Sequence, residues 1–445
     1  MVNSMPEYEA ENTNESTEPE LTEPEITEQE LPEEEPVVIE AAPEPPERPK
    51  PDGVVGWFTE RFDSCDLFDS QIPAERRRAG LDDGVAPIDY IGKAMWVVFV
   101  LLIISGIGLL AGYVPTVAGA FNSIERIQAD FPFGWWFRGV HKWGTDLFII
   151  LAIARLVRLA YRRGYKSTGE FGWIWALAVL AIGMTAGLTG YLLVWHQRAF
   201  WMGSILQSDP LSSEGVWPLG GLGLKGWAAE QVTGGTEITP SVLTGIFVLH
   251  LTLAFAILVP VFCRQLAKRR MVPKFRHLSL YVPPGLLWAV LGILTFIALI
   301  LPPPTGSPSD GILKPNPIIS DWFFLGCYQL IDILTPTIAG WIIGIGILVG
   351  ILLPWIDRSS AKGPRPAVTA LIIATLFTWF ALTLKAFGWT VSAPWIFIII
   401  AVVWILAFAL AAMAEYEPLR PEDIEAVEVV VEIDIDEDDE EVVAE

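Results

Sequence analysis

Long apolar stretches are the feature of this sequence that most restricts its fold. A helix of roughly 20 apolar residues crosses the hydrocarbon core of a bilayer, and in lipid its backbone groups must be hydrogen-bonded internally. The sequence therefore predicts an all-α integral membrane protein with about eight transmembrane helices. The stretches lie at residues 94–114, 147–161, 173–195, 242–263, 281–301, 338–355, 367–384 and 394–414.

Most acidic residues lie at the two ends of the chain, outside these stretches. Of the 52 acidic residues, 16 fall within residues 1–50 and 15 within residues 415–445. Such charged segments with few large apolar residues cannot bury enough surface to offset the entropy of folding. We therefore expect disordered acidic tails at residues 1–55 and 415–445, with an amphipathic surface segment at residues 56–80.

Basic residues predict the orientation in the membrane. Clusters of arginine and lysine at 76–78, 155–166, 264–276 and 358–365 all fall on one side of the predicted spans. The positive-inside rule makes this side cytoplasmic. We expect a multi-pass protein of the cell (inner) membrane with both termini in the cytoplasm.

Two of the four histidines lie at matching depths in the predicted spans. His141 stands at the outer start of the second span, and His250 lies near the outer end of the fourth. Two imidazoles from facing helices can hold six-coordinate haem iron inside a helical bundle. A membrane histidine can equally be a hydrogen-bonded core residue, so the pair alone leaves both interpretations open.

Longer stretches resemble the cytochrome b/cytochrome b6 family of Rieske–cytochrome b complexes. FGWWFRGVHKWGTDLFIILAIARLVRLAY, EFGWIWALAVLAIGMTAGLTGYLLVWHQRAFW and VLTGIFVLHLTLAF resemble its second, third and fourth helices, and NPIISDWFFLGCYQLI resembles its quinol-site region. The resemblance covers roughly residues 56–390, with a cytochrome b6-like half and a subunit IV-like half in one chain. It implies a haem-binding four-helix domain at residues 81–277 and a second four-helix block at residues 278–414.

In that family the second and fourth helices each carry two histidines, usually fourteen residues apart, for an outer and an inner haem. Fourteen residues rise about 21 Å along a helix, which places the two haems at two depths. His141 and His250 match the outer pair, but Arg155 and Arg264 stand at the inner positions. A guanidinium offers iron no lone pair, so we expect one haem b, on the outer side. Arg155 and Arg264 either reach toward the cytoplasmic interface or bind an anion in the vacated space.

The resemblance implies further residues around the haem. Gly106 and Gly190 match positions where glycine lets a haem approach the backbone, and Gly92 lies fourteen residues before Gly106. The corresponding inner position on the third helix is Ala176. Arg138 resembles the arginine that pairs with a propionate of the outer haem.

The sequence SDWF at residues 320–323 resembles the PEWY motif of the family's quinol-oxidation site. The resemblance places Asp321 and Trp322 in this site, with Asp321 as the carboxylate that accepts a quinol proton. A carboxylate at the edge of a low-dielectric pocket is suited to act as a general base. Asp321 can alternatively cap a loop. His196 either shuttles the second quinol proton or hydrogen-bonds a loop.

The resemblance therefore implies the cytochrome b subunit of a quinol:cytochrome c, or similar acceptor, oxidoreductase. The implied partners are a Rieske iron–sulfur protein, a c-type cytochrome and the lipid membrane, in a homodimeric complex without nucleic acid. Two alternatives remain. One is a haem-free membrane scaffold derived from cytochrome b, and the other is a one-haem quinol dehydrogenase subunit that feeds a multihaem partner without a quinone cycle.

Overall fold

The structure is a computed structural model of the chain. It describes residues 53–64, 67, 90–162, 164–166, 169–208, 242–271, 284–315, 321–334, 336–357, 366–386 and 393–415. The two acidic tails expected from the sequence, and the basic cluster at 76–78, lie outside these residues.

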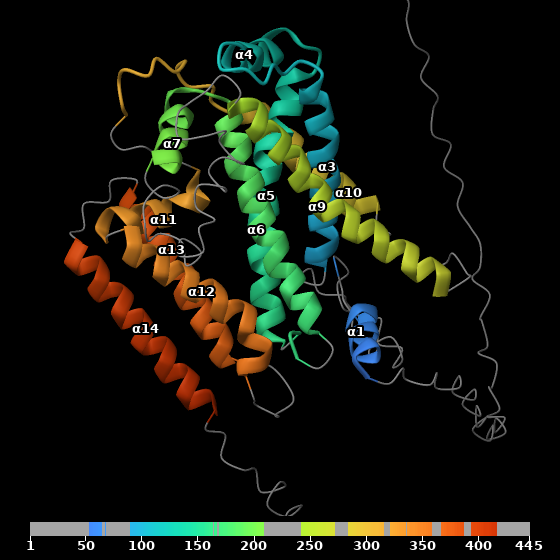
Figure 1. The fold of residues 1–445 in the computed structure, drawn as a ribbon, viewed down its shortest axis with the longest axis vertical. Coiled ribbons are helices and arrows are strands. Elements are labelled where there is room, and N and C mark those ends of the chain that lie inside the picture. Colours follow the sequence, from blue (N-terminus) through green and yellow to red (C-terminus); the bar gives the residue numbers. More distant parts are fainter. Residues whose placement is uncertain are drawn as a thin grey trace, which may run out of the picture. The chain divides into compact units, whose positions relative to one another are not determined.

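All named elements in the described residues are helices, which confirms the predicted all-α fold (Figure 1). The eight apolar stretches correspond to eight of these helices: α3 (Ile91–Leu110), α5 (Gly134–Tyr161), α6 (Glu170–Leu193), α9 (Val242–Met271), α10 (Pro284–Ile300), α12 (Pro336–Ile356), α13 (Pro366–Ala386) and α14 (Ala393–Glu415). The shorter helices are α1 (Gly53–Ser64), α4 (Ala120–Asp130), α7 (Gln197–Ser208) and α11 (Trp322–Ile333).

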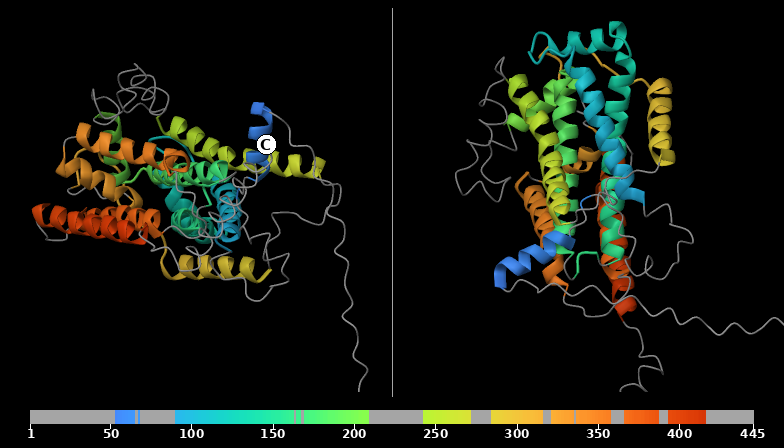
Figure 2. Two further views of the ribbon diagram at one scale, coloured as in Figure 1. Left: turned by 90° about the horizontal axis from the view of Figure 1, so that it is seen from below. Right: turned by 90° about the vertical axis from the view of Figure 1, so that its right-hand side faces the viewer.

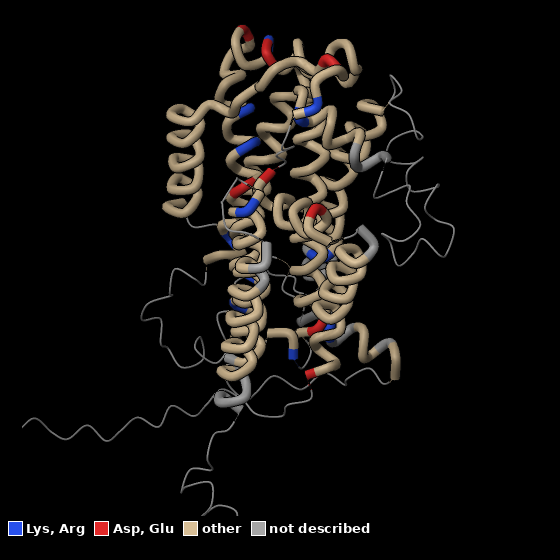
Figure 3. The backbone as a smooth tube through the Cα atoms, turned by 90° about the vertical axis from the view of Figure 1, so that its left-hand side faces the viewer, with Lys and Arg blue, Asp and Glu red and all other residues tan. Residues whose placement is uncertain are grey.

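Five of the described helices are both long and apolar enough to cross a membrane, namely α3, α6, α9, α12 and α13. The helix α10 is shorter, with 17 residues, whereas α14 is apolar over most of its 23 residues. The helix α5 has 28 residues but carries five charged ones, so its polar groups must be satisfied inside the protein. Figure 3 shows how few charged residues the helices contain. Large apolar side chains on α10, α12 and α14 are exposed, as lipid-facing surfaces require.

The helix α5 lies at the centre of the described contacts. It packs against α3 and α6, and α9 packs on the other side of α6. The helix α10 also packs against α5, where Gly139 allows a close approach, because a Cβ atom there would lie 2.4 Å from the Ala298 Cβ atom. In the remainder of the second block, α11 packs against α13, and α13 packs against α14 and α5. The helix α5 therefore contacts helices of both blocks, namely α3 and α6 of the first and α10 and α13 of the second.

A corner at one end of α5 is formed by α4, which lies across the ends of the long helices (Figure 2). Phe133 has a left-handed backbone, with φ of 58°, immediately before α5 begins. Gly134 follows, and a Cβ atom at this position would lie 1.7 Å from the Ile127 carbonyl oxygen. The chain can therefore turn from α4 into α5 only with glycine at position 134.

The other end of α5 is tied to the second block through a buried hydrogen bond. The Tyr165 hydroxyl donates to the Asp357 carboxylate over 2.7 Å, and the Lys166 ammonium lies 3.8 Å from the same carboxylate. Nearby, the Trp173 indole donates to the Gly350 carbonyl over 2.8 Å. These bonds join the α5–α6 connection to the end of α12.

The Tyr165→Phe substitution tests this tie. It leaves a buried carboxylate with one donor fewer, so we expect a loss of about 1–3 kcal/mol of stability and a lower melting temperature. Tyr161→Phe is the matched control, because Tyr161 is 45% exposed at the end of α5, four residues before Tyr165. Equal melting temperatures of the two variants in detergent would contradict a stabilising role for the Tyr165 hydroxyl.

Candidate functional site

The two membrane histidines face each other from α5 and α9. The ring centres of His141 and His250 are 6.1 Å apart, with an angle of 59° between the ring planes. Imidazole nitrogens bind metals at about 2.0 Å, so two rings on opposite sides of one metal have centres about 6 Å apart. The separation therefore fits one metal atom between the rings.

Hydrogen bonds determine which nitrogen of His141 is available as a ligand. Its Nδ1 lies 3.1 Å from the Leu102 carbonyl oxygen and 3.1 Å from the Ser105 hydroxyl. The Ser105 hydroxyl donates its own proton to the Leu101 carbonyl over 2.7 Å. Because the Leu102 carbonyl can only accept, Nδ1 carries the ring proton, and the lone pair is on Nε2.

The environment of His250 repeats this arrangement on the other helix pair. Its Nδ1 lies 2.9 Å from the Thr189 hydroxyl, which donates its proton to the carbonyls of Thr185 and Ala186. Nδ1 of His250 is therefore the donor, and Nε2 again holds the lone pair. Two neutral imidazoles fixed by a second shell of acceptors are what bis-histidine haem ligation requires, so these residues fit haem b.

One glycine follows Ser105 and another follows Thr189, and each leaves room for a histidine ring. A Cβ atom on Gly106 would lie 3.2 Å from Cε1 of His141, and a Cβ atom on Gly190 would lie 3.2 Å from Cε1 of His250. The structure thus places both glycines beside the histidine rings, and the approach of a haem to them remains a prediction. Gly92 is buried in the first turn of α3, fourteen residues from Gly106.

Arg138 is buried in α5 and binds the segment that follows α10. Its two terminal nitrogens donate to the carbonyls of Pro303 and Pro304 over 2.7 and 2.8 Å. The arginine therefore fixes the backbone of this segment one turn from His141. Its pairing with a haem propionate remains a prediction.

The positions of the inner ligands are filled by packed side chains. Arg155 and Arg264 are each only 4% exposed, and the Arg155 guanidinium donates to the Leu67 carbonyl, which the Trp175 indole also reaches over 3.2 Å. Between this level and the two histidines lies the largest described apolar cluster. Its fully or nearly fully buried members include Phe99, Phe148, Ala152, Val179, Ile257 and Val261.

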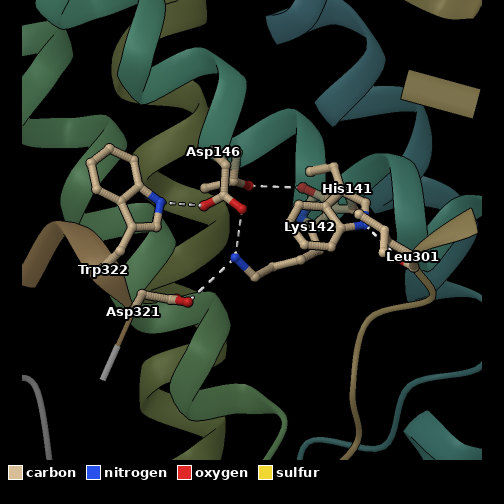
Figure 4. Close-up of polar contacts among 8 residues, drawn as sticks. His141, Lys142, Asp146, Leu301, Asp321 and Trp322 are labelled. Carbon is tan, nitrogen blue, oxygen red and sulfur yellow. Dashed lines mark hydrogen bonds and ion pairs between the residues drawn. The ribbon is translucent and has the colours of Figure 1, made fainter. Parts of the chain in front are cut away.

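Asp321 occupies the N-cap position of α11, but its side chain makes no capping hydrogen bond. The carboxylate instead lies 3.3 Å from the Lys142 ammonium, one residue beyond His141 (Figure 4). Burial raises the pKa of Asp321 above its usual range; the Lys142 ammonium opposes this rise, and the Asp146 carboxylate adds to it. A general base with a raised pKa accepts a proton more readily near neutral pH.

Trp322 and Phe323 hold the start of α11 against the first block. The Trp322 indole donates to the Asp146 carboxylate over 3.0 Å. The Phe323 ring lies against α6, where a Cβ atom on Gly187 would come within 2.6 Å of it. Asp321 is therefore held beside α5 and α6. Ser320 and His277 lie outside the described residues.

His196 is the residue immediately before α7. Its Nδ1 accepts a hydrogen bond from the Ala199 N–H over 2.9 Å, and its ring makes an edge contact with Tyr191, with centres 5.0 Å apart. Burial lowers the pKa of His196, which favours the neutral ring. A hydrogen-bonding role for His196 is present in the structure, and the proton-shuttle role remains a prediction.

Four residues of the site were not singled out from the sequence. Ser105 and Thr189 each precede a glycine that lies beside a histidine ring, and this repeated hydroxyl–glycine pair was a usable signal. Lys142 and Asp146 are charged residues four apart on a helix that enters the membrane, a pattern that indicates an internal ion pair.

Comparisons with known proteins identify the family of this chain. Residues 83–271 match the family model "Cytochrome b/b6/petB", and residues 308–408 match "Cytochrome b(C-terminal)/b6/petD". The chain is 26% identical over 376 residues to a "Cytochrome bc complex cytochrome b subunit" of Chlorobaculum thiosulfatiphilum, which covers 79% of this chain and 83% of that protein. It is 32% identical over 201 residues to cytochrome b6 of Acaryochloris marina, covering 44% of this chain and 86% of the relative.

A solved structure titled "Hyperthermophilic respiratory Complex III" contains a similar fold. Its matching chain is 24% identical, with a TM-score of 0.60, over 81% of this chain and 98% of that one. The fold and the paired histidines define a haem-binding membrane protein of electron transport. The chain belongs to the cytochrome b/b6 family and is a cytochrome b subunit of the bc and b6f type.

The Gly190→Val substitution tests the space around His250. The added methyl groups extend from a Cβ position already 3.2 Å from the ring, so the imidazole must move. We expect haem b per polypeptide to fall below about half of the wild-type value. Gly292→Val on α10 is the matched control, because no atom lies within 4 Å of a Cβ there. If Gly190→Val binds as much haem b per polypeptide as the wild type, the space around the His250 ring is larger than the structure indicates.

Proposed function

We propose that this chain is the quinol-oxidising subunit of a quinol:cytochrome c, or similar acceptor, oxidoreductase, with a single haem b on the outer side. The observation that carries the proposal is the pair of imidazoles with their Nε2 lone pairs free, 6.1 Å apart between ring centres. His141 and His250 would hold the haem, which supplies a one-electron acceptor when bound. At the inner level, two buried arginines stand where the family places the second pair of histidines.

In the proposed reaction, Asp321 accepts a proton from the quinol hydroxyl. The carboxylate lies beside the helix that carries His141, so proton and electron leave the same end of the substrate. Trp322 holds Asp321 in place through its bond to Asp146, and buried aromatic rings such as Phe323 exclude water. His196 lies beyond Tyr191 and is the proposed second proton acceptor.

The apolar packing between the two histidines and the two buried arginines restricts the path of the second electron. Fourteen residues of helix separate the two levels, a rise of about 21 Å, and apolar side chains occupy the space between them. A second electron cannot use an inner haem held by α5 and α9. Either it leaves by another route, such as a multihaem partner, or another subunit completes the path.

The remaining assignments rest on the relatives. The Chlorobaculum protein is named as a subunit of a cytochrome bc complex, which supports partnership with a Rieske iron–sulfur protein and a c-type cytochrome. We also propose a homodimeric complex in the cell membrane, with both termini cytoplasmic. The proposed division is a haem-binding domain at residues 81–277 and a subunit IV-like domain at residues 278–414. The arrangement of both histidines disfavours a haem-free scaffold.

Haem content is the direct test of the one-haem proposal. We expect about one haem b per polypeptide by pyridine haemochrome, a single titrating species in a redox titration, and loss of both signals in His141→Leu. His277→Leu is the control, because the sequence places this histidine on the cytoplasmic side. Two haems per polypeptide would contradict the missing inner site, and none would favour the scaffold.

Quinol oxidation by the assembled complex tests the role of Asp321. Asp321→Asn removes the proton acceptor, so we expect the rate to fall by about 100-fold or more while haem content stays constant. Asp332→Asn is the control on the same helix, because Asp332 is exposed and accepts a hydrogen bond from Gln329. A full rate in Asp321→Asn would refute Asp321 as the base.

A further inference from the structure

Asp146 is a buried carboxylate that directly precedes the predicted span at residues 147–161. It lies in α5, five residues after His141, and is only 8% exposed. Acidic residues in membrane helices are rare, and those that occur pair with other groups and commonly serve a function. The role of Asp146 is not explained by haem binding, because its partners are the Trp322 indole of α11 and the Lys142 ammonium rather than His141.

The Lys142 ammonium lies between two carboxylates. It is 2.8 Å from Asp146 and 3.3 Å from Asp321, and Figure 4 shows the three side chains in line. With all three ionised, the group has a net charge of −1. One added proton makes it neutral, and a low-dielectric surrounding favours the neutral state.

Other elements that pack near Asp321 contribute few charges. Among the described residues, Tyr191 of α6 interacts electrostatically with Asp321, and Arg198 of α7 interacts with Tyr191. The helix α13, which packs against α11, carries its basic residue Lys385 in its last turn. Lys142 and Asp146 are the charged side chains with the largest influence on Asp321.

We propose that Asp146 is a second carboxylate of the quinol-oxidation site, which competes with Asp321 for the Lys142 ammonium and thereby keeps Asp321 basic enough to take the quinol proton. This inference rests on the proposed function of Asp321. The O–H bond of the quinol breaks, its proton binds an Asp321 oxygen, and the electrons leave to the redox partners named above. Asp146 is a positioning residue in this scheme, because it acts through Asp321.

The distances explain why the competition matters. If Lys142 paired with Asp321 alone, the full ion pair would favour the ionised carboxylate and weaken it as a base. Asp146 is 0.5 Å closer to the ammonium than Asp321 is, at 2.8 against 3.3 Å. The ammonium is therefore shared between two carboxylates, and Asp146 offsets part of its effect on Asp321.

The pH profile of quinol oxidation in Asp146→Asn tests the proposal. Asparagine keeps an oxygen for the Trp322 indole but removes the competing charge, so the pKa of Asp321 should fall. Because the base must be ionised to act, the rate rises with pH through this pKa. We expect the rising limb to move about one unit toward lower pH and the plateau rate to fall several-fold.

Three further variants separate the possible roles. Asp146→Glu retains the charge and should keep the wild-type limb, and Asp332→Asn should leave the profile unchanged. In Asp146→Asn/Asp321→Asn, the residual rate should equal that of Asp321→Asn, since Asp146 acts only through Asp321. If Asp146→Asn has a reduced rate but the rising limb of its pH profile stays at the wild-type position, Asp146 has only a structural role. This result would overturn the proposal.

Failure of the proposal for Asp146 can be distinguished from failure of the proposed function. If Asp321→Asn keeps the full rate, Asp321 is not the quinol base and the proposed function fails. If Asp321→Asn is inactive but the pH profile of Asp146→Asn is not shifted, only the role of Asp146 is refuted. If Asp146→Asn does not assemble, infrared titration of the wild-type protein decides. An Asp321 carboxyl signal that titrates above the range of an exposed aspartate supports the proposal, and one that titrates like an exposed aspartate contradicts it.

Discussion

The cost of an unpaired polar group in lipid is the constraint on which this structure depends. It explains why Nδ1 of His141 and Nδ1 of His250 each have an acceptor, and why Asp146 shares a lysine with Asp321. Each of these bonds also determines chemistry, because it fixes a tautomer or the charge near Asp321. The helix α5 brings them together, since it carries His141, Lys142 and Asp146 within two turns.

The fold could be predicted from the sequence to a large extent, because apolar length alone determines which segments can cross a bilayer. All eight stretches are helical, including α5, whose charged residues are satisfied inside the protein. The packing of α10 against α5 was not predictable, since it depends on the fit of Gly139 to Ala298 rather than on any repeating pattern. Length and hydropathy define helices but not their neighbours.

The candidate site was predictable only where single residues carry the signal. His141 and His250 could be named because few residue types bind haem iron, and spacing identified Arg155 and Arg264 as departures. The contact of Lys142 with Asp321 joins residues far apart in the chain, so no local pattern predicts it. The bond from the Ala199 N–H to His196 likewise depends on how the backbone turns into α7, which sequence spacing does not reveal.

The packed inner half of the first block also bears on energy conversion. Moving one elementary charge across a membrane potential of 100 mV takes about 2.3 kcal/mol, and this work is done only where charge crosses the insulating layer. Here, the proposed redox chemistry is confined to one side of a layer of apolar side chains between His141 and Arg155. In the proposed one-haem subunit, this layer would act as a dielectric barrier beneath the redox site. Electron transfer from the quinol to the proposed haem would therefore depend little on the membrane voltage.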